Sequence, residues 1–255
     1  MVTLYGRKTV LEVLQDPSIT IFRTHLAKSN RNSDTIEEIE ILAKKREVEI
    51  CYHDKAALSR ISKNGRQDQG VAVDIESESY KDISQTIQST GDLIGLDNIT
   101  NPQNLGMVVR SVAASPMGGL LLPKKGCAKI DPLVQKASAG TLFKATIYHT
   151  ATLEEGLKFL KSVDFDLIAL TGKSDIRLSE LPLQSDRRRI FLLGNETSGI
   201  RDSIRQSCDI EVCIPMENNV ESINVAAAAT LVAFCLLYTS PSPRDATLSR
   251  MPSSA

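Results

Sequence analysis

The sequence of 255 residues contains no tryptophan, three histidines and five cysteines. The cysteines are Cys51, Cys127, Cys208, Cys213 and Cys235. They form no C-x-x-C pair, and the histidines are scattered along the chain. This spacing argues against a zinc site and against a disulfide framework, and it indicates a reducing compartment. We therefore predict no bound metal and a cytoplasmic location.

Long apolar runs and an excess of charge are also missing. The longest apolar run, residues 225–238, is interrupted only by Thr230 and is too short to span a bilayer. No signal-peptide pattern opens the sequence, so we expect no membrane partner. The net charge of −1 excludes nucleic-acid binding through overall charge. We interpret the dense basic runs, residues 124–125 and 187–189, as solvated loop charge.

Several nucleotide-binding and catalytic motifs are absent as well. No G-x-G-x-x-G follows a strand pattern, and neither a serine nucleophile elbow nor a Cys–His arrangement is present. In LLGNETSG (192–199), Gly194 and Gly199 have the separation seen in a phosphate-binding loop. However, Ile200 and Arg201 stand where lysine and serine or threonine would hold phosphate and magnesium. Dinucleotide binding, covalent catalysis and nucleotide hydrolysis therefore have no support.

The length allows two domains, because a domain usually has about 100–200 residues. We predict a small α/β domain over residues 1–75. Its patterns predict helices over 7–15 and 36–43 and strands over 48–52 and 69–75. Residues 76–91 are polar, and we expect them to hold a linker and a short helix.

Residues 92–238 alternate strand and helix patterns, which is typical of a parallel sheet covered on both faces. The predicted strands are 92–99, 118–123, 165–171, 189–194 and 210–215. The predicted helices are 104–114, 132–140, 153–162, 199–206 and 223–238. Residues 239–255 are rich in serine, proline and arginine without an apolar period. We interpret them as a non-native or disordered tail.

The stretch NPQNLGMVVR (101–110) begins an apolar helical face with polar residues. From Leu105 onward, apolar residues follow the spacing i, i+3, i+4, i+7 and i+8. We predict that Asn104, just before this face, caps the helix. Arg110 lies off the apolar stripe, about one turn beyond Gly106, which leaves space beside it. Read alone, the stretch favours a capped helix with one exposed arginine.

Two further stretches place polar residues beside buried strands. Glu196 lies at the tip of a buried strand, where it is either a capping or turn acid or a functional carboxylate. In CIPMENNVESINVAAAATLVAF (213–234), Ser222 and Asn224 flank the start of an alanine-dense helix that other backbone can approach closely. A capped core helix accounts for the alanines. It does not account for the polar turn ENNVESIN between two apolar elements.

Together, NPQNLGMVVR, LLGNETSGI and IPMENNVESINVAAAA resemble the three ordered motifs of the SpoU (TrmH-like) family of SPOUT-class RNA 2′-O-ribose methyltransferases. The resemblance covers residues 92–238. LYGRKTVLEVL and QDQGVAV resemble the family's N-terminal substrate-binding domain, which is related in fold to ribosomal L30e-type RNA binders. The resemblance implies a parallel α/β sheet with a C-terminal trefoil knot, a homodimer, and S-adenosylmethionine as the cofactor.

The resemblance also implies roles for individual residues. The cofactor-binding positions are matched by Gly194, Ile214 and Ile223, and we place Met216 and Thr171 in the same site. The catalytic and RNA-contacting positions are matched by Asn104, Arg110, Glu196, Ser222 and Asn224. We interpret Arg110 as a clamp on the target phosphate and hydroxyl, because a guanidinium with a pKa above about 12 gives up its proton reluctantly. Glu196 and Asn104 would then orient Arg110 or the ribose, and Ser222 and Asn224 would shape the knot loop.

The predicted activity is methylation of a ribose 2′-hydroxyl in structured RNA. We favour 23S rRNA over tRNA, because the N-terminal domain resembles the form attached to rRNA-modifying members of the family. Recognition of RNA by shape, phosphates and 2′-hydroxyls does not require a basic chain. A catalytically inactive RNA-binding protein of the same fold is the alternative from another class.

Overall fold

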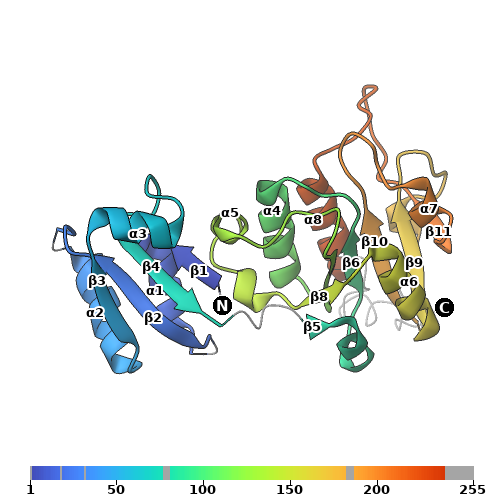
Figure 1. Ribbon diagram of the computed structural model, residues 1–255. Coiled ribbons are helices and arrows are strands. Elements are labelled where there is room, and N and C mark those ends of the chain that lie inside the picture. The colour runs from blue at the N-terminus through green and yellow to red at the C-terminus, as the bar shows by residue number, and fades with distance from the viewer. Residues whose placement is uncertain (1, 18, 32, 77–80, 182–186, 239–255) are drawn as a thin grey trace, which may run out of the picture.

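The computed structural model describes residues 2–17, 19–31, 33–76, 81–181 and 187–238. The predicted tail, residues 239–255, lies outside the described residues. The described chain forms two β-sheets, one from each end of the sequence (Figure 1). Within this part of the chain, no helix is both long and apolar enough to cross a membrane.

The first sheet is mixed and has the strand order β1-β4-β2-β3. Its strands are β1 (Val2–Tyr5), β2 (Ile21–Ala27), β3 (Glu49–His53) and β4 (Val71–Ile75). The β1–β4 and β4–β2 pairs are antiparallel, and β2 pairs with β3 in parallel. Helices α1 (Arg7–Gln15) and α2 (Asp34–Lys45) pack on one face, and α3 (Lys55–Ser62) packs on the other. Strands β1 and β2 and helix α3 were not predicted.

The second sheet has seven strands in the order β11-β9-β10-β6-β7-β8-β5, and every pair is parallel. The strands are β5 (Lys81–Asp82), β6 (Leu93–Leu96), β7 (Gly119–Pro123), β8 (Ile147–Thr150), β9 (Phe165–Leu170), β10 (Arg188–Leu193) and β11 (Ile210–Val212). This arrangement confirms the predicted parallel α/β sheet. Strand β5 and the 3₁₀ helix η1 (Ile83–Gln88) lie in the stretch predicted as a linker and short helix.

Helices cover both faces of the seven-stranded sheet (Figure 1). On one face lie α4 (Pro102–Ala113), α5 (Pro132–Ala137) and α8 (Val225–Tyr238). On the other lie α6 (Leu153–Ser162) and α7 (Asp202–Arg205). Two short 3₁₀ helices, η2 (Leu142–Lys144) and η3 (Leu178–Glu180), complete the connections. Burial on both faces explains why the central strands read as continuous apolar runs rather than as alternating patterns.

Gly106 serves the packing of α4 against α5. A Cβ atom at this position would lie 2.5 Å from the carbonyl oxygen of Val134 and would also overlap Ala137. The two helices can therefore approach this closely only because residue 106 lacks a side chain. The expectation that Gly106 leaves space for Arg110 is wrong, because α5 fills that space.

The interpretation of the arginine run at 187–189 as solvated loop charge holds for Arg187, which is exposed just before β10, but it is wrong for the other two arginines. Arg188 and Arg189 lie in β10, and Arg189 is only 8% exposed. Arg189 forms an ion pair with Asp92 at 2.7 Å, and the Arg188 guanidinium lies 4.3 Å from the centre of the Phe165 ring. These side chains fasten the first residues of β10 to neighbouring elements. Arg188 and Arg189 therefore contribute mainly to packing and ion pairing.

Strand β6 is the point where the chain direction across the sheet reverses. From β6 the chain moves to β7 and β8, and it then crosses to β9 on the opposite side of β6. Strand β10 inserts between β9 and β6, and β11 pairs on the outer side of β9. In open parallel sheets, ligands bind beyond the carboxyl ends of strands at such a reversal. A ligand site is therefore expected among the loops that follow β6, β9, β10 and β11.

Candidate active site at the carboxyl ends of four parallel strands

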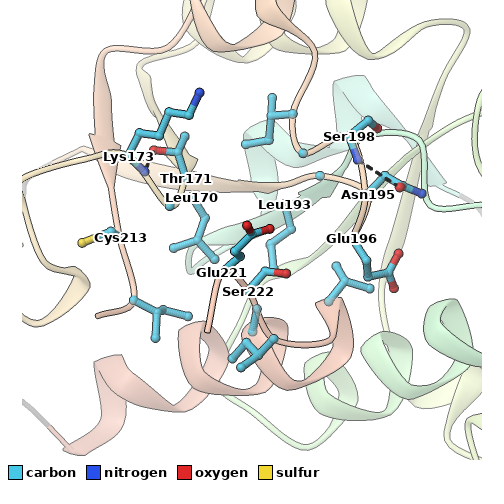
Figure 2. A pocket seen from close by; sticks show the side chains of 18 of the residues that line it. Leu170, Thr171, Lys173, Leu193, Asn195, Glu196, Ser198, Cys213, Glu221 and Ser222 are labelled. Atoms are coloured by element: carbon cyan, nitrogen blue, oxygen red, sulfur yellow. Dashed lines mark hydrogen bonds between the residues drawn. The ribbon is translucent and has the colours of Figure 1, made fainter. Parts of the chain in front are cut away.

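Three of these loops line one cavity of about 820 Å³, a volume within the usual range of about 300–1,000 Å³ for small-molecule sites (Figure 2). The lining residues come from 170–173 at the end of β9, 193–200 at the end of β10, and 213–216 and 220–223 after β11. Asp202 and Arg205 of α7 and Val225 and Ala228 of α8 complete the lining. Figure 2 shows Thr171 and Glu196 on opposite sides of the cavity, with Ser222 between them. Segments far apart in the sequence thus share one concave site.

The loop after β10 is a tight turn. The Asn195 N–H donates to the Gly199 carbonyl oxygen at 3.1 Å, and the Gly199 N–H donates to the Asn195 carbonyl oxygen at 2.8 Å. The Asn195 side-chain oxygen also accepts from the Thr197 N–H at 2.9 Å. Gly199 has φ 68°, in the left-handed region that glycine adopts easily. A Cβ atom at Gly194 would overlap the backbone of Gly199, so this turn requires glycine at residue 194.

Three side chains from three different motifs form a hydrogen-bonded group at the rim of the cavity. The Asn104 amide nitrogen donates to the Glu196 carboxylate. The Asn224 amide nitrogen donates to the Asn104 side-chain oxygen at 3.0 Å. Asn104 is 7% exposed, whereas Glu196 and Asn224 are exposed. The described residues offer no other partner to Glu196, whose second carboxylate oxygen is therefore available to a ligand.

Asn104 does not cap α4, contrary to the sequence-based expectation. The helix begins at Pro102, and Asn101 caps it by accepting from the Gln103 N–H at 2.9 Å. Proline suits the first helical position because its fixed φ matches the helix and its missing N–H has no partner there. The helix therefore begins two residues earlier than predicted, and Asn104 is free to bond to Glu196.

Asn224 is fixed by the helix that it precedes. Its side-chain oxygen accepts from the Ala226 N–H at 2.8 Å, so its amide nitrogen is directed to another partner. The buried alanines of α8 pack in the same core as α4, and the Ser111 and Thr230 hydroxyls of the two helices lie 2.7 Å apart. Close packing of the alanine-dense helix thus brings the third motif to the first.

The apolar part of the cavity includes Leu170, Leu193, Ile214 and Ile223. The backbone amides of Ile214, Met216 and Ile223 form no hydrogen bond within the described residues. These residues are half-buried, so their amides are accessible to a ligand in the cavity. Apolar walls with unpaired backbone donors and acceptors suit a flat heterocycle. Lys173, Arg205 and Glu221 add charges of both signs that suit a zwitterion.

An ion pair between a buried carboxylate and a half-exposed arginine, which the sequence did not reveal, holds the turn against β6. The Asp97 carboxylate accepts from the Arg201 backbone N–H and from its Nε, both at 2.8 Å, and it is 1% exposed. Arg201 also donates to Glu154 at 2.7 Å. The hydrogen bond from its guanidinium to the Asp97 carboxylate raises the pKa of Arg201 above its ordinary value. The pair connects the end of the tight turn to the carboxyl end of β6.

Substitution of Asp97 by asparagine is expected to lower the free energy of unfolding by about 1–3 kcal/mol, because an amide N–H₂ would face the Arg201 donors in a buried place. The expected loss is moderate because the Arg201 side chain is 46% exposed, so solvent screens the pair. Urea-induced unfolding measures the effect. The matched control is Asp202→Asn, whose ion pair with Arg205 leaves the carboxylate 80% exposed and should matter by less than about 0.5 kcal/mol. Equal losses in the two variants would contradict the role of Asp97.

Most of the predicted site residues come together, and one does not. The cavity is lined by Thr171, Gly194, Glu196, Ile214, Met216, Ser222 and Ile223. Asn104 and Asn224 join Glu196 at the rim. Arg110 is exposed on α4, does not line the cavity and makes no hydrogen bond or ion pair within the described residues. Since α4 turns about 100° per residue, six residues place Arg110 roughly 120° around the helix from Asn104.

Comparison with known proteins gives two family matches. Residues 93–234 match the SpoU rRNA Methylase family, and residues 3–81 match a family described as RNA 2′-O ribose methyltransferase substrate binding. An uncharacterized tRNA/rRNA methyltransferase of Mycolicibacterium smegmatis is 28% identical over 89% of this chain and 73% of its own length. The 23S rRNA (guanosine-2′-O-)-methyltransferase RlmB of Xylella fastidiosa is 27% identical over 91% of this chain and 94% of its own length.

The fold also resembles solved structures. The SpoU methyltransferase AviRb from Streptomyces viridochromogenes, in complex with AdoMet, has a TM-score of 0.75 at 19% identity, covering 92% of this chain and 89% of its own. At this level of identity the likeness establishes a shared α/β fold with a parallel sheet.

Proposed function

The chain belongs to the SpoU rRNA methylase family of RNA methyltransferases, and we propose that it transfers a methyl group from S-adenosylmethionine to a ribose 2′-hydroxyl of structured RNA. The observation that carries the proposal is the Asn104–Glu196–Asn224 group, which joins three motifs at the rim of a cofactor-sized cavity. We favour 23S rRNA because a relative matched over nearly its whole length is named for that substrate. The second candidate substrate is tRNA.

The cavity fits S-adenosylmethionine by its chemistry. Ile214 and Ile223 would contact the adenine, and the unpaired backbone amides beside them would bind its edge. Glu221 and Lys173 carry charges complementary to the ammonium and carboxylate of the methionine part. Met216 and Thr171 would complete the walls around the cofactor. When bound, the cofactor supplies a methyl group on a positively charged sulfonium.

The chain's own residues would position the ribose. The free carboxylate oxygen of Glu196 would accept a hydrogen bond from the 2′-hydroxyl, while Asn104 holds the other oxygen. Arg110 would clamp the adjacent phosphate through its planar fork of donors. The hydroxyl proton would leave late, to solvent, because Arg110 remains protonated. Ser222 and Asn224 would shape the loop over the methionine end.

Because Arg110 lies outside the cavity of its own chain, we infer a homodimer in which it serves the partner's cavity. Arg110 shares the exposed side of α4 with Met107, which is 41% exposed, and Leu231 on α8 is 47% exposed. Large apolar side chains on two packed helices favour a contact between proteins. A twofold contact through these helices would present each Arg110 to the other chain.

We further propose that residues 1–75 bind the RNA substrate as an L30e-like domain, with residues 92–238 forming the knotted catalytic domain. A cavity of about 610 Å³ in the first domain is lined by three cations, Arg7, Lys55 and Arg66, by one carboxylate, Asp68, and by several neutral polar groups. Cationic side chains of this kind contact phosphates without reading sequence. For the predicted trefoil knot, the support is α8, which returns from β11 to pack against α4.

The proposed function is tested with labelled S-adenosylmethionine and with 23S rRNA or tRNA that lacks 2′-O-methylation. We expect label on a ribose of one nucleotide in 23S rRNA. Label only in tRNA would move the assignment to the second substrate. Label on a base would exclude ribose methylation. RNA binding without any label would favour an inactive RNA-binding protein.

A further inference from the structure

Three side chains that commonly bind transition metals converge on the four-stranded sheet, away from the methyltransferase cavity. His25 lies on β2, and Cys51 and His53 lie on the edge strand β3. The parallel register places His25 opposite Cys51 and Ala27 opposite His53. Because alternate residues of a strand face the same side, all three side chains lie on one face. One nitrogen of each ring and the Cys51 sulfur all lie within 4.8 Å of one another.

The ring of His25 is held in place from its other side. Its Nε2 lies 3.0 Å from the Asp74 carboxylate, and the Thr3 hydroxyl donates to the second Asp74 oxygen at 2.6 Å. His25 is 4% exposed and Asp74 is 6% exposed. A carboxylate that accepts from the far nitrogen of an imidazole is the usual second partner of a metal-binding histidine. Here it leaves Nδ1 of His25 directed at the other two side chains.

A chain of hydrogen bonds is the simpler explanation of the cluster. Nδ1 of His25 and Nε2 of His53 lie 2.9 Å apart, so one ring can donate to the other without an ion. That explanation gives no role to the thiol of Cys51, although its sulfur lies within 4.8 Å of both ring nitrogens. Two imidazoles and a thiol are together the donor set that zinc prefers. Two nitrogens at this separation also need only a small shift to bind one ion at about 2.0–2.1 Å each.

We propose that His25, Cys51 and His53 bind one Zn²⁺ ion through Nδ1, Sγ and Nε2, with Asp74 as the hydrogen-bonding partner of His25. The fourth position is open to water or to Glu49. On binding, the thiol proton leaves to solvent and the sulfur donates an electron pair to the ion. The proton shared by the two rings moves to Nδ1 of His53, so both rings remain neutral. The ion would tie the edge strand β3 to β2.

The sequence argues against such a site because its histidines are far apart and no C-x-x-C pair is present. Folding changes the spacing: residues 25 and 51 become direct neighbours across a parallel strand pair. The inference does not depend on the proposed methyltransferase function, since none of the three residues lines that cavity.

The test uses the full chain, stripped of metal by a chelator and titrated with Zn²⁺ against a chromogenic zinc chelator. We expect one ion per chain. With Co²⁺ as the probe, we expect a thiolate-to-cobalt charge-transfer band that disappears in Cys51→Ser. Zinc binding should be lost in Cys51→Ser and in His53→Gln. Asp74→Asn should weaken it by about 10–100-fold.

The matched controls are Cys208→Ser and His149→Gln, which change the same residue types outside the cluster and should leave zinc binding unchanged. Circular dichroism of the metal-free variants shows whether they fold. Cys51 and His53 are only half-buried on an edge strand, so both variants should fold. Absence of binding by the unmodified chain, or binding that survives both cluster substitutions, would overturn the proposal. The cluster would then be a hydrogen-bonded chain from Asp74 through His25 to His53.

Discussion

Replacement of Arg110 by alanine is expected to slow methyl transfer by about 10²–10³-fold, the usual cost of removing one donor that stabilises a transition state. The fold and the affinity for S-adenosylmethionine should not change. Arg110 is exposed, lies outside the cavity and has no hydrogen bond or ion pair in the part of the chain that the structure describes. Single-turnover methylation, calorimetric titration of the cofactor and thermal unfolding measure the three quantities separately.

Two variants sharpen this expectation. Arg110→Lys keeps the charge but lacks the planar fork of donors, so its rate should lie between those of the unmodified chain and Arg110→Ala. Lys158→Ala removes an exposed cation from α6 and should have no effect on the rate. A normal rate in Arg110→Ala would remove this residue from the mechanism. Loss of cofactor affinity in the same variant would place Arg110 in the cofactor site instead.

Mixing two inactive chains tests whether Arg110 serves the partner's cavity. A dimer of Arg110→Ala with Glu196→Ala would contain one complete site if the arginine acts across the interface. Random exchange of twofold dimers then restores about a quarter of the normal rate per chain. If Arg110 acts within its own chain, every site in the mixture is defective. The rate of the mixture would then equal the mean of the two separate variants.

Local patterns predicted five of the seven strands of the parallel sheet and missed β8 and the two-residue strand β5. Strands such as β6 and β10 are short apolar runs because both of their faces are buried, and runs of this kind are visible in the sequence. Element ends were less predictable. The helix expected over 199–206 is reduced to Asp202–Arg205, because the tight turn and its bond to Asp97 occupy the preceding residues.

Long-range pairs account for what local patterns missed. Arg189 was predicted to be loop charge because its partner, Asp92, lies 97 residues earlier in the sequence, where no local pattern reveals the pair. His25 and Cys51 are far apart in the sequence, and only the parallel pairing of β2 with β3 makes them neighbours. For the candidate site, motif order indicated which residues would meet, and seven of the ten expected residues line the cavity. Motif order could not indicate that Arg110 would lie on another side of α4.

Substitution of Gly194 by alanine is expected to weaken binding of S-adenosylmethionine by about 5–150-fold. The new Cβ atom would overlap the carbonyl carbon and oxygen of Gly199 and the amide nitrogen of Ile200. These are backbone atoms, so the turn must open to relieve the overlap, at a cost of about 1–3 kcal/mol. If the cofactor binds only to the closed turn, its binding free energy becomes less favourable by the same amount. A change of about 1–3 kcal/mol corresponds to an affinity about 5–150-fold weaker. Calorimetric titration and urea unfolding measure the two effects.

Gly199→Ala is the matched control because it lies in the same turn but meets no atom within 4 Å. Its cost arises only from φ 68°, which is unfavourable for alanine by roughly 1 kcal/mol. We therefore expect Gly199→Ala to retain more cofactor affinity than Gly194→Ala. A lower cofactor affinity in Gly199→Ala than in Gly194→Ala would contradict this expectation. It would show that the open space beside Gly199, and not the close contact between Gly194 and Gly199, controls cofactor binding.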